Sequence, residues 1–352
     1  MNYLTKICLA GCAALAMAGQ TSKEAKPELI DAKAIWGRAP HNAFTDLIRF
    51  KDRWYCVFRE GRAHVSPDGA IRVLTSVDGE VWVSAALLSS ETADLRDPKL
   101  SITPDRRLMI NAAGAIHPPS GVRHQSVAWF SLEGRHWTGP VEIGDPNMWL
   151  WRVTWHLGRA YSAGYSTQGA RVIRLYTSSD GTDFETLGGR MFQGGNPSES
   201  TILFLPDNSA LCLLRQDGET PNAQLGRAFP PYRGWTWKDL GLRIGGPNII
   251  QLPDDRILAA GRLYDGKVRT SLCWLDPERG RITEFLTLPS GGDTSYPGLV
   301  FHDGLLWVSY YASHEGKAMI YLAKVKLPPQ PFSKTSRRSD SSIPPTHLNY
   351  SK

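Results

Sequence analysis

Six side chains capable of chemistry recur along this chain at a pitch of about fifty residues. Each opens a segment in which a polar residue is followed by an apolar strand, a turn and a second apolar strand. These leading residues are Asp46, Asp97, Arg152, Glu199, Asn248 and Tyr296. Carboxylates can act as acids or bases, arginine can hold an anion, and a phenol beside a carboxylate can become a nucleophile. Gathered in one place, the six would form a site rather than a core.

The spacing of these segments predicts the fold that would gather them. The steps between leading residues are 51, 55, 47, 49 and 48 residues. A repeat of this length built from short strands is typical of an all-β, six-bladed propeller of four-stranded antiparallel blades. Each leading residue would open the innermost strand of its blade at one mouth of the central channel. The second strands return to that mouth, so Arg59, Arg215 and Arg262, just past their ends, are further candidates.

Both ends of the chain read as non-globular. Residues 1–19 resemble a signal peptide, with Lys6, an apolar run and a small-residue cleavage site at Ala16-Met17-Ala18. Leu9-Ala10-Gly11-Cys12 resembles a lipobox, so a lipid anchor at Cys12 is the alternative to simple export. Residues 30–327 form the predicted propeller, and 328–352 a disordered tail. We therefore expect an exported protein of the bacterial periplasm, cell surface or extracellular space, without a transmembrane segment.

Amino-acid composition and the absence of known motifs limit the classes of ligand and partner that we expect. Cys56, Cys212 and Cys273 lie in apolar strand contexts and are predicted to be buried thiols. The net charge of +6 suits an anionic ligand. No nucleic-acid, zinc or EF-hand pattern appears, so we expect no nucleic-acid partner, no metal and no cofactor. We also expect a monomer.

A second repeat lies in the outer part of three blades. Its copies each combine serine, an acidic residue, glycine and an aromatic residue; they are 76–82, 131–137 and 178–184. The acidic side chain can accept hydrogen bonds from turn N–H groups, and glycine supplies a positive φ. We interpret these segments as structural hairpin turns.

These turns resemble shortened Asp-boxes of sialidases and related six-bladed propellers. Phe44–Arg62 resembles the opening blade of that family, and 199–215 resembles the segment that carries its essential glutamate. Ala259–Arg262 and 295–310 resemble the segments with another arginine and the catalytic tyrosine. The resemblance implies that Tyr296 is the nucleophile and Glu199 its general base. It also implies that Arg215 and Arg262 hold the carboxylate of an acidic sugar, which is released with retention.

The sequence also departs from the family. Ala43 stands where sialidases carry the first of three arginines, and Arg59, Arg62 or Arg152 are candidate replacements. Asp46 and His64 are further candidates for contact with the ligand. The acid/base is open between Asp68, which matches by spacing, Asp97 at the head of the second blade, and His64. The resemblance thus implies an exo-glycosidase with a tyrosine nucleophile that acts on a glycan or glycoconjugate substrate. The alternative is a non-catalytic propeller that binds glycan at the same mouth.

Overall fold

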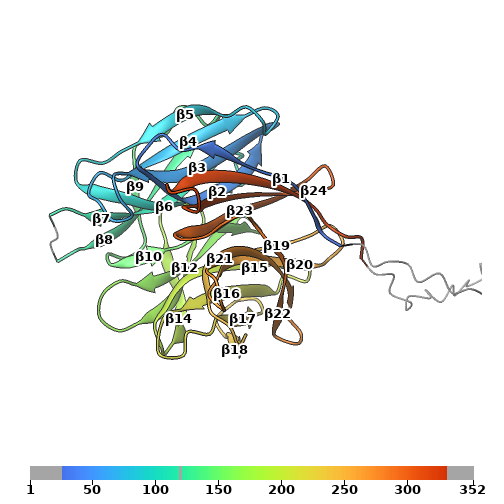
Figure 1. Cartoon of the computed structure of the whole chain (residues 1–352). Coiled ribbons are helices and arrows are strands. Elements are labelled where there is room, and N and C mark those ends of the chain that lie inside the picture. The colour runs from blue at the N-terminus through green and yellow to red at the C-terminus, as the bar shows by residue number, and fades with distance from the viewer. Residues whose placement is uncertain (1–25, 119–120, 331–352) are drawn as a thin grey trace, which may run out of the picture. The chain divides into compact units, whose positions relative to one another are not determined.

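The computed structural model of the chain describes residues 26–118 and 121–330. Every regular element within these ranges is a β-strand, and the strands form six antiparallel sheets (Figure 1). This confirms the predicted all-β, six-bladed propeller. The predicted signal peptide with Cys12 lies outside the described residues, as does the tail beyond residue 330. In the part of the chain that is described, no helix is long and apolar enough to span a membrane.

The first three blades follow the chain in order. Blade 1 consists of β2 (His41–Phe50), β3 (Arg53–Gly61), β4 (Ala70–Ser76) and β5 (Val83–Leu88). Blade 2 consists of β6 (Ala93–Ile102), β7 (Leu108–Ile116), β8 (His124–Ser131) and β9 (Val141–Ile143). Blade 3 consists of β10 (Met148–Leu150), β11 (Thr154–His156), β12 (Arg159–Ser166), β13 (Val172–Ser178) and β14 (Glu185–Gln193). Its innermost strand is thus broken in two, because β10 and β11 both pair with β12.

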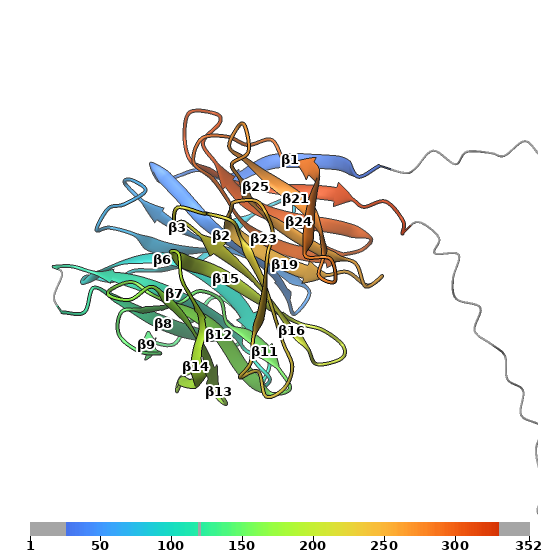
Figure 2. The same cartoon turned by 90° about the horizontal axis from the view of Figure 1, so that it is seen from below.

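The last three blades complete the circle. Blade 4 consists of β15 (Pro197–Phe204), β16 (Ala210–Gln216), β17 (Gln224–Ala228) and β18 (Thr236–Asp239). Blade 5 consists of β19 (Ile244–Gln251), β20 (Ile257–Leu263), β21 (Arg269–Asp276) and β22 (Arg281–Thr287). Blade 6 consists of β23 (Thr294–His302), β24 (Leu305–Ala312), β25 (Met319–Lys326) and the N-terminal β1 (Glu28–Trp36). Strand β1 pairs antiparallel with β25 and so ties the start of the propeller to its end (Figure 2).

The innermost strands form a closed ring. Contacts run from β2 to β6, β11, β15, β19 and β23 in turn, and β23 contacts β2 again. Buried apolar side chains fill the space between neighbouring blades; Trp54 of blade 1 and Trp307 of blade 6, for example, have ring centroids 4.5 Å apart. The three described cysteines are buried free thiols, as predicted. Ring closure is what brings the starts of distant strands together.

A repeated backbone irregularity marks the start of the innermost strands. In blades 1, 2, 4, 5 and 6 the pairing with the second strand slips over two residues, as in a β-bulge. Phe44, Asp97, Gly246 and Tyr296 lie in these bulges with φ of 66°, 53°, 57° and 55°. Such a conformation is costly for a residue other than glycine and is often found at functional sites. The bulges therefore single out this end of the channel.

Contrary to the prediction, the six leading residues do not occupy equivalent positions, because they lie at different places relative to the bulges. Asp97 and Tyr296 occupy the first bulged position, and Glu199 occupies the second. Asp46 and Asn248 resume regular pairing after the bulge, opposite Val57 and Ala260. Each bulge places two residues of the inner strand opposite one residue of the second strand. Asp46 and Asn248, which follow the bulge, therefore lie deeper in the channel than predicted.

The outer hairpin turns form as the sequence predicts. Between β4 and β5, Asp78 Oδ1 accepts hydrogen bonds from Ser76 Oγ and from the backbone N–H groups of Glu80 and Val81, at 2.8–3.0 Å. Gly79 has a φ of 76°, which only glycine adopts without strain. These turns therefore have a structural role at the rim of the blades, and the side chains with catalytic potential lie at the channel mouth.

Candidate active site

A phenol, a carboxylate and a guanidinium converge at the bulged end of the channel. Tyr296 Oη donates a hydrogen bond to Glu199 Oε1, although the two residues are 97 positions apart. Arg215 Nη1 donates to the same Glu199 oxygen at 2.8 Å and lies 3.4 Å from Tyr296 Oη. The residues come from β23, β15 and β16. This arrangement places a base within proton-transfer distance of an alcohol that could attack an electrophile.

Local backbone features hold this cluster in place. Glu199 Oε2 accepts the backbone N–H of Gly246 at 2.7 Å, so both carboxylate oxygens are fixed. A Cβ added to Gly246 would lie 2.7 Å from the Tyr296 ring, which explains glycine at that bulge. The Tyr296 ring also packs against Phe44 and Trp151, with centroids 4.9 and 5.6 Å away. The phenol therefore has little freedom to turn away from Glu199.

Burial keeps the Tyr296 phenol protonated. Loss of solvent raises the pKa of Tyr296 well above its usual value, and the neighbouring Glu199 carboxylate raises it further. The Arg215 guanidinium opposes this shift but does not cancel it. A phenol in this state needs a base to remove its proton as it attacks, and the Glu199 carboxylate is in place to do so.

Arg262 also lies beside the tyrosine. Its guanidinium carbon is 5.7 Å from the Tyr296 ring centroid. Its donors reach Thr294 O at 2.7 Å, Tyr311 Oη at 2.9 Å and Asp293 Oδ1 at 3.3 Å. Arg215 and Arg262 each keep about 15% of the side chain exposed. The structure thus brings both predicted arginines to the mouth, inside the last residues of β16 and β20.

Asp97 lies at the same mouth in an unusual environment. The residue is only 6% exposed, and its Oδ1 has no hydrogen-bond partner among the described residues. Burial raises the pKa of its carboxyl group to about 6, although Arg96 and Lys99 oppose the shift and Glu199 adds to it. A carboxyl group with a pKa close to neutrality can both give and take a proton at working pH. Among the three sequence candidates for acid/base, Asp97 has the electrostatics that the role requires.

Two cations that the sequence analysis missed flank Asp97. Arg96 lies over the Phe44 ring at 5.1 Å and donates to Asp94 Oδ2 and His64 O. Lys99 Nζ is 5.7 Å from the Tyr296 ring centroid, and burial lowers its pKa to about 8. The sequence signal was present, since both residues immediately flank the Asp97-Pro98 bulge. Without the bulge, however, alternation along a strand would have pointed Arg96 and Asp97 to opposite faces.

Asp46 and Arg152, both predicted to contact the ligand, form an ion pair with each other within the channel. Arg152 Nη1 and Nη2 donate to the two oxygens of Asp46 at 2.8 and 3.0 Å. Asp46 also accepts the backbone N–H of Leu100 at 2.8 Å and is almost fully buried. Arg152 can reach across because it lies in the break between β10 and β11. The pair joins blades 1, 2 and 3, with both oxygens of the carboxylate already used.

Arg59 is also structural, contrary to the prediction. Its side chain is fully buried and donates to Asp94 Oδ1 at 2.7 Å, to Ala63 O at 2.8 Å and to Ser66 O at 3.0 Å. By register it is equivalent to Arg262, since Ala43 pairs with Arg59 as Gly245 pairs with Arg262. The difference is the loop 62–69, which folds over Arg59 and uses its donors.

Replacing Arg59 should therefore change stability. We expect Arg59→Met to lower the free energy of unfolding by about 3 kcal/mol, because it removes the partner of a buried carboxylate. Urea denaturation of the purified protein measures this. Arg62→Met, which removes an ion pair with a 71%-exposed arginine in the same loop, should have little effect and serves as the control. If Arg59→Met is as stable as the wild type but binds the ligand more weakly, Arg59 contacts the ligand instead.

Asp68 and His64 lie in that loop and differ in their surroundings. The hydrogen bonds found for Asp68 in the described chain all lie within the loop, including one from Arg62 N at 3.2 Å. The bond from Ser66 contributes most to lowering the pKa of Asp68, the opposite of what a general acid needs. The structure thus argues against Asp68 as acid/base. His64 Nδ1 lies 2.6 Å from Asp293 Oδ2, at the edge of the mouth.

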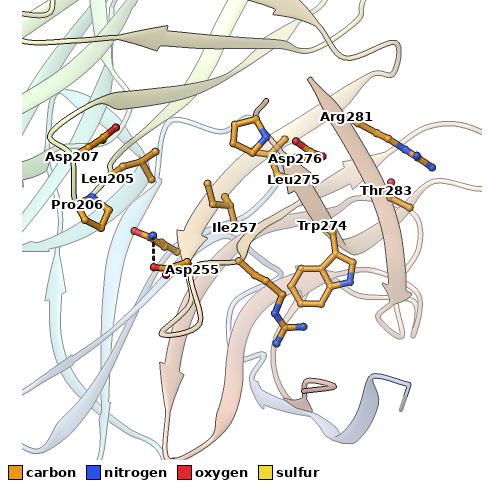
Figure 3. A pocket seen from close by; sticks show the side chains of 13 residues that line it. Leu205, Pro206, Asp207, Asp255, Ile257, Trp274, Leu275, Asp276, Arg281 and Thr283 are labelled. Atoms are coloured by element: carbon orange, nitrogen blue, oxygen red, sulfur yellow. Dashed lines mark hydrogen bonds between the residues drawn. The ribbon is translucent and has the colours of Figure 1, made fainter. Parts of the chain in front are cut away.

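A large groove lies away from this cluster. It has a volume of about 750 Å³ and is lined by Leu205–Asp207, by residues between Gln251 and Ile257, and by Trp274–Pro277 (Figure 3). Leu205–Asp207 and the turn before Ile257 follow the ends of β15 and β19, and Trp274–Pro277 lie at the end of β21. Glu199 and Gly246, in contrast, lie near the starts of β15 and β19. Trp274 is covered by Arg256 at 4.5 Å and stacks on Phe285 at 4.4 Å, so its ring faces are not free to receive a sugar.

Comparison with known proteins supports the fold. No protein-family model and no curated protein match this chain. A protein of unknown function from Dyadobacter fermentans superposes with a TM-score of 0.76 at 19% identity, covering 86% of this chain and 99% of the other. A Trypanosoma rangeli sialidase bound to the inhibitor DANA gives 0.65 at 13% identity, covering 81% and 55%, so this chain spans about half of its length. An α-L-arabinofuranosidase from Fusarium graminearum gives 0.64 at 12% identity, covering 82% and 94%. The chain therefore has the six-bladed propeller fold found in these sialidase and arabinofuranosidase structures.

Proposed function

We propose that this protein is an exo-glycosidase that removes a terminal acidic sugar with retention, using Tyr296 as nucleophile and Glu199 as its base. The observation that carries the proposal is the hydrogen bond from Tyr296 Oη to Glu199 Oε1 in a buried setting. Similarity of fold to a sialidase and an arabinofuranosidase supports a glycosidase but does not name the sugar.

Charge at the mouth favours an anionic sugar. Arg215, Arg262, Arg96 and Lys99 surround Tyr296 and Asp97. Ala43, where sialidases carry an arginine, is fully buried, and we propose that Arg96 supplies the third guanidinium from blade 2. A neutral phenol nucleophile suits such a substrate, since a carboxylate would repel a sugar that carries its own negative charge.

The residues can carry out a two-step displacement. In the first step, Tyr296 Oη attacks the anomeric carbon, and its proton passes to Glu199. The glycosidic bond breaks, and the departing oxygen takes a proton from Asp97. In the second step, water gives a proton to Asp97 and attacks the same carbon, while Tyr296 leaves and recovers its proton from Glu199. Two inversions at one carbon give net retention.

A substrate panel tests the proposal directly. We expect the purified protein to hydrolyse at least one acidic aryl glycoside, from a set of sialosides, uronides and neutral glycosides. NMR at early times should show the sugar released in its original anomeric form. Binding of acidic sugars without hydrolysis of any panel member would favour the non-catalytic glycan-binding propeller. Hydrolysis confined to neutral glycosides would reject the role assigned to the four cations.

Export also belongs to this proposal. We propose that residues 1–19 direct export, either through cleavage after Ala18 or through removal of residues 1–11 and attachment of a lipid to Cys12. Residues 30–327 then act as the single functional domain. The mass of the mature N-terminal peptide, from protein expressed with its leader in a bacterium, distinguishes cleavage after Ala18 from lipidation at Cys12.

A further inference from the structure

A second group of chemically capable side chains lies beside the proposed active site. His41 is the first residue of β2, His64 lies in the loop after β3, and Asp293 immediately precedes β23. Their ligand atoms converge: His41 Nε2 and His64 Nδ1 lie 3.1 and 2.6 Å from Asp293 Oδ2. All three atoms lie within 4.8 Å of one another. Separations of 229 and 252 positions from Asp293 hid this cluster from any analysis of sequence spacing.

We propose that His41, His64 and Asp293 bind a divalent transition-metal ion such as Zn²⁺. Two imidazole nitrogens and one carboxylate oxygen form a donor set that such ions prefer over Mg²⁺ or Ca²⁺. Zn²⁺ holds these ligands at about 2.0–2.2 Å, which places neighbouring ligand atoms roughly 3.4 Å apart around a tetrahedral ion. The two separations from Asp293 Oδ2, 3.1 and 2.6 Å, are shorter than that value, so the imidazoles must move away from the carboxylate by up to about 1 Å to admit the ion.

The surroundings of Asp293 match those of a metal ligand. Its other oxygen, Oδ1, accepts a hydrogen bond from Tyr311 Oη at 2.7 Å and lies 3.3 Å from Arg262 Nη2. Outer hydrogen bonds of this kind orient ligating carboxylates and leave the second oxygen to face the ion. The Asp293 carboxylate is thereby fixed with Oδ2 directed at the two imidazoles.

The cluster is accessible and lies close to the proposed nucleophile. The side chains of His64 and Asp293 are 47% and 29% exposed, so an ion can enter and keep a coordination position open to solvent. Phe44 separates the cluster from Tyr296, with its ring centroid 5.1 Å from that of His64 and 4.9 Å from that of Tyr296. A divalent ion with one carboxylate ligand retains positive charge. We infer that its open position would attract an anionic or hydroxyl-bearing part of a ligand at the mouth.

Calorimetric titration of the chelator-treated full-length protein with ZnCl₂ tests this inference without any enzymatic assay. We expect one equivalent to bind with a dissociation constant in the micromolar range or tighter, and the melting temperature to rise on binding. His41→Ala, His64→Ala and Asp293→Asn should each weaken binding at least tenfold. His136→Ala serves as a matched control, because His136 is a 95%-exposed histidine that also pairs with a carboxylate, Glu133.

Several outcomes would overturn the inference. Absence of Zn²⁺ binding would show that the cluster is a hydrogen-bonded His–Asp–His group without an ion. Unchanged affinity in all three variants, with circular dichroism confirming that they are folded, would place the ion elsewhere. Each result is independent of hydrolysis, so failure of this site would leave the proposed glycosidase activity standing, and the reverse also holds.

Discussion

Tyr296→Phe should lower kcat/KM on the best glycoside substrate by about 10⁴-fold or more, because it removes the attacking oxygen. The ring contacts with Phe44 and Trp151 remain, and Glu199 keeps its bonds to Arg215 and Gly246. The variant should therefore fold and bind the sugar with an affinity close to that of the wild type. Initial rates and calorimetric binding to the same substrate measure the two effects separately.

Tyr310→Phe is the matched control for this prediction. Tyr310 is fully buried in the same blade and donates a hydrogen bond to Pro289 O at 2.9 Å, so the two variants lose comparable chemical groups. Normal turnover in Tyr310→Phe and a large loss in Tyr296→Phe would show that the loss comes from the Tyr296 hydroxyl at the channel mouth. Removal of a buried hydroxyl elsewhere in the blade would then be excluded as the cause. Wild-type turnover in Tyr296→Phe would eliminate the tyrosine nucleophile and with it the proposed mechanism.

Asp97→Asn should lower kcat/KM by about 10³-fold on substrates with poor leaving groups, since the departing oxygen then has no proton donor. Aryl glycosides whose phenols are strongly acidic should be much less affected in the first step, because they leave without protonation. Asparagine tolerates the positive φ at this position about as well as aspartate. Comparing alkyl and activated aryl glycosides with the same variant measures the difference.

The pH dependence of kcat/KM, compared between the wild type and Asp97→Asn, is a second test of Asp97 as the general acid. A general acid must be protonated, so kcat/KM of the wild type should fall as the pH rises through about 6, the raised pKa of Asp97. Asp97→Asn should lose that limb of the profile. Asp105→Asn, in the exposed turn between β6 and β7, should keep it and serves as the control. Retention of the limb in Asp97→Asn would transfer the acid role to another group.

Asp97→Asn should raise the stability of the protein while it lowers the activity. The folded pKa of Asp97 lies above the usual 3.8, so the folded protein holds this proton more tightly than the unfolded chain between pH 3.8 and about 6. Stability then declines as the pH rises through this window, and an ionised Asp97 costs about 2–3 kcal/mol at higher pH. We expect Asp97→Asn to melt at a higher temperature than wild type at pH 7.5, with the gap closing near pH 4. An equal or lower melting temperature at pH 7.5 would show that Arg96 and Lys99 fully compensate the charge.

The sequence by itself determined the architecture and the outline of the proposed site. Blade number follows from a repeated pattern of apolar strands and turn residues, and both are local properties of the chain. The two-residue turn at Lys51-Asp52, with both residues at positive φ, is one example. Because equivalent strands start at the same end of a closed ring, the repeat also predicted that Glu199 and Tyr296 lie near one another.

Only the tertiary structure decided what each polar side chain does there. Arg59 and Arg262 are equivalent by register. The loop 62–69 buries Arg59, whereas Arg262 remains partly exposed at the mouth. Asp46 is used by Arg152, which reaches it through a break in blade 3. Arg96 and the cluster at Asp293 depend on bulges and on contacts between blades. Sequence periodicity tracks the average direction of side chains along regular strands. A two-residue bulge or a covering loop changes that direction through contacts between segments that are distant in the chain.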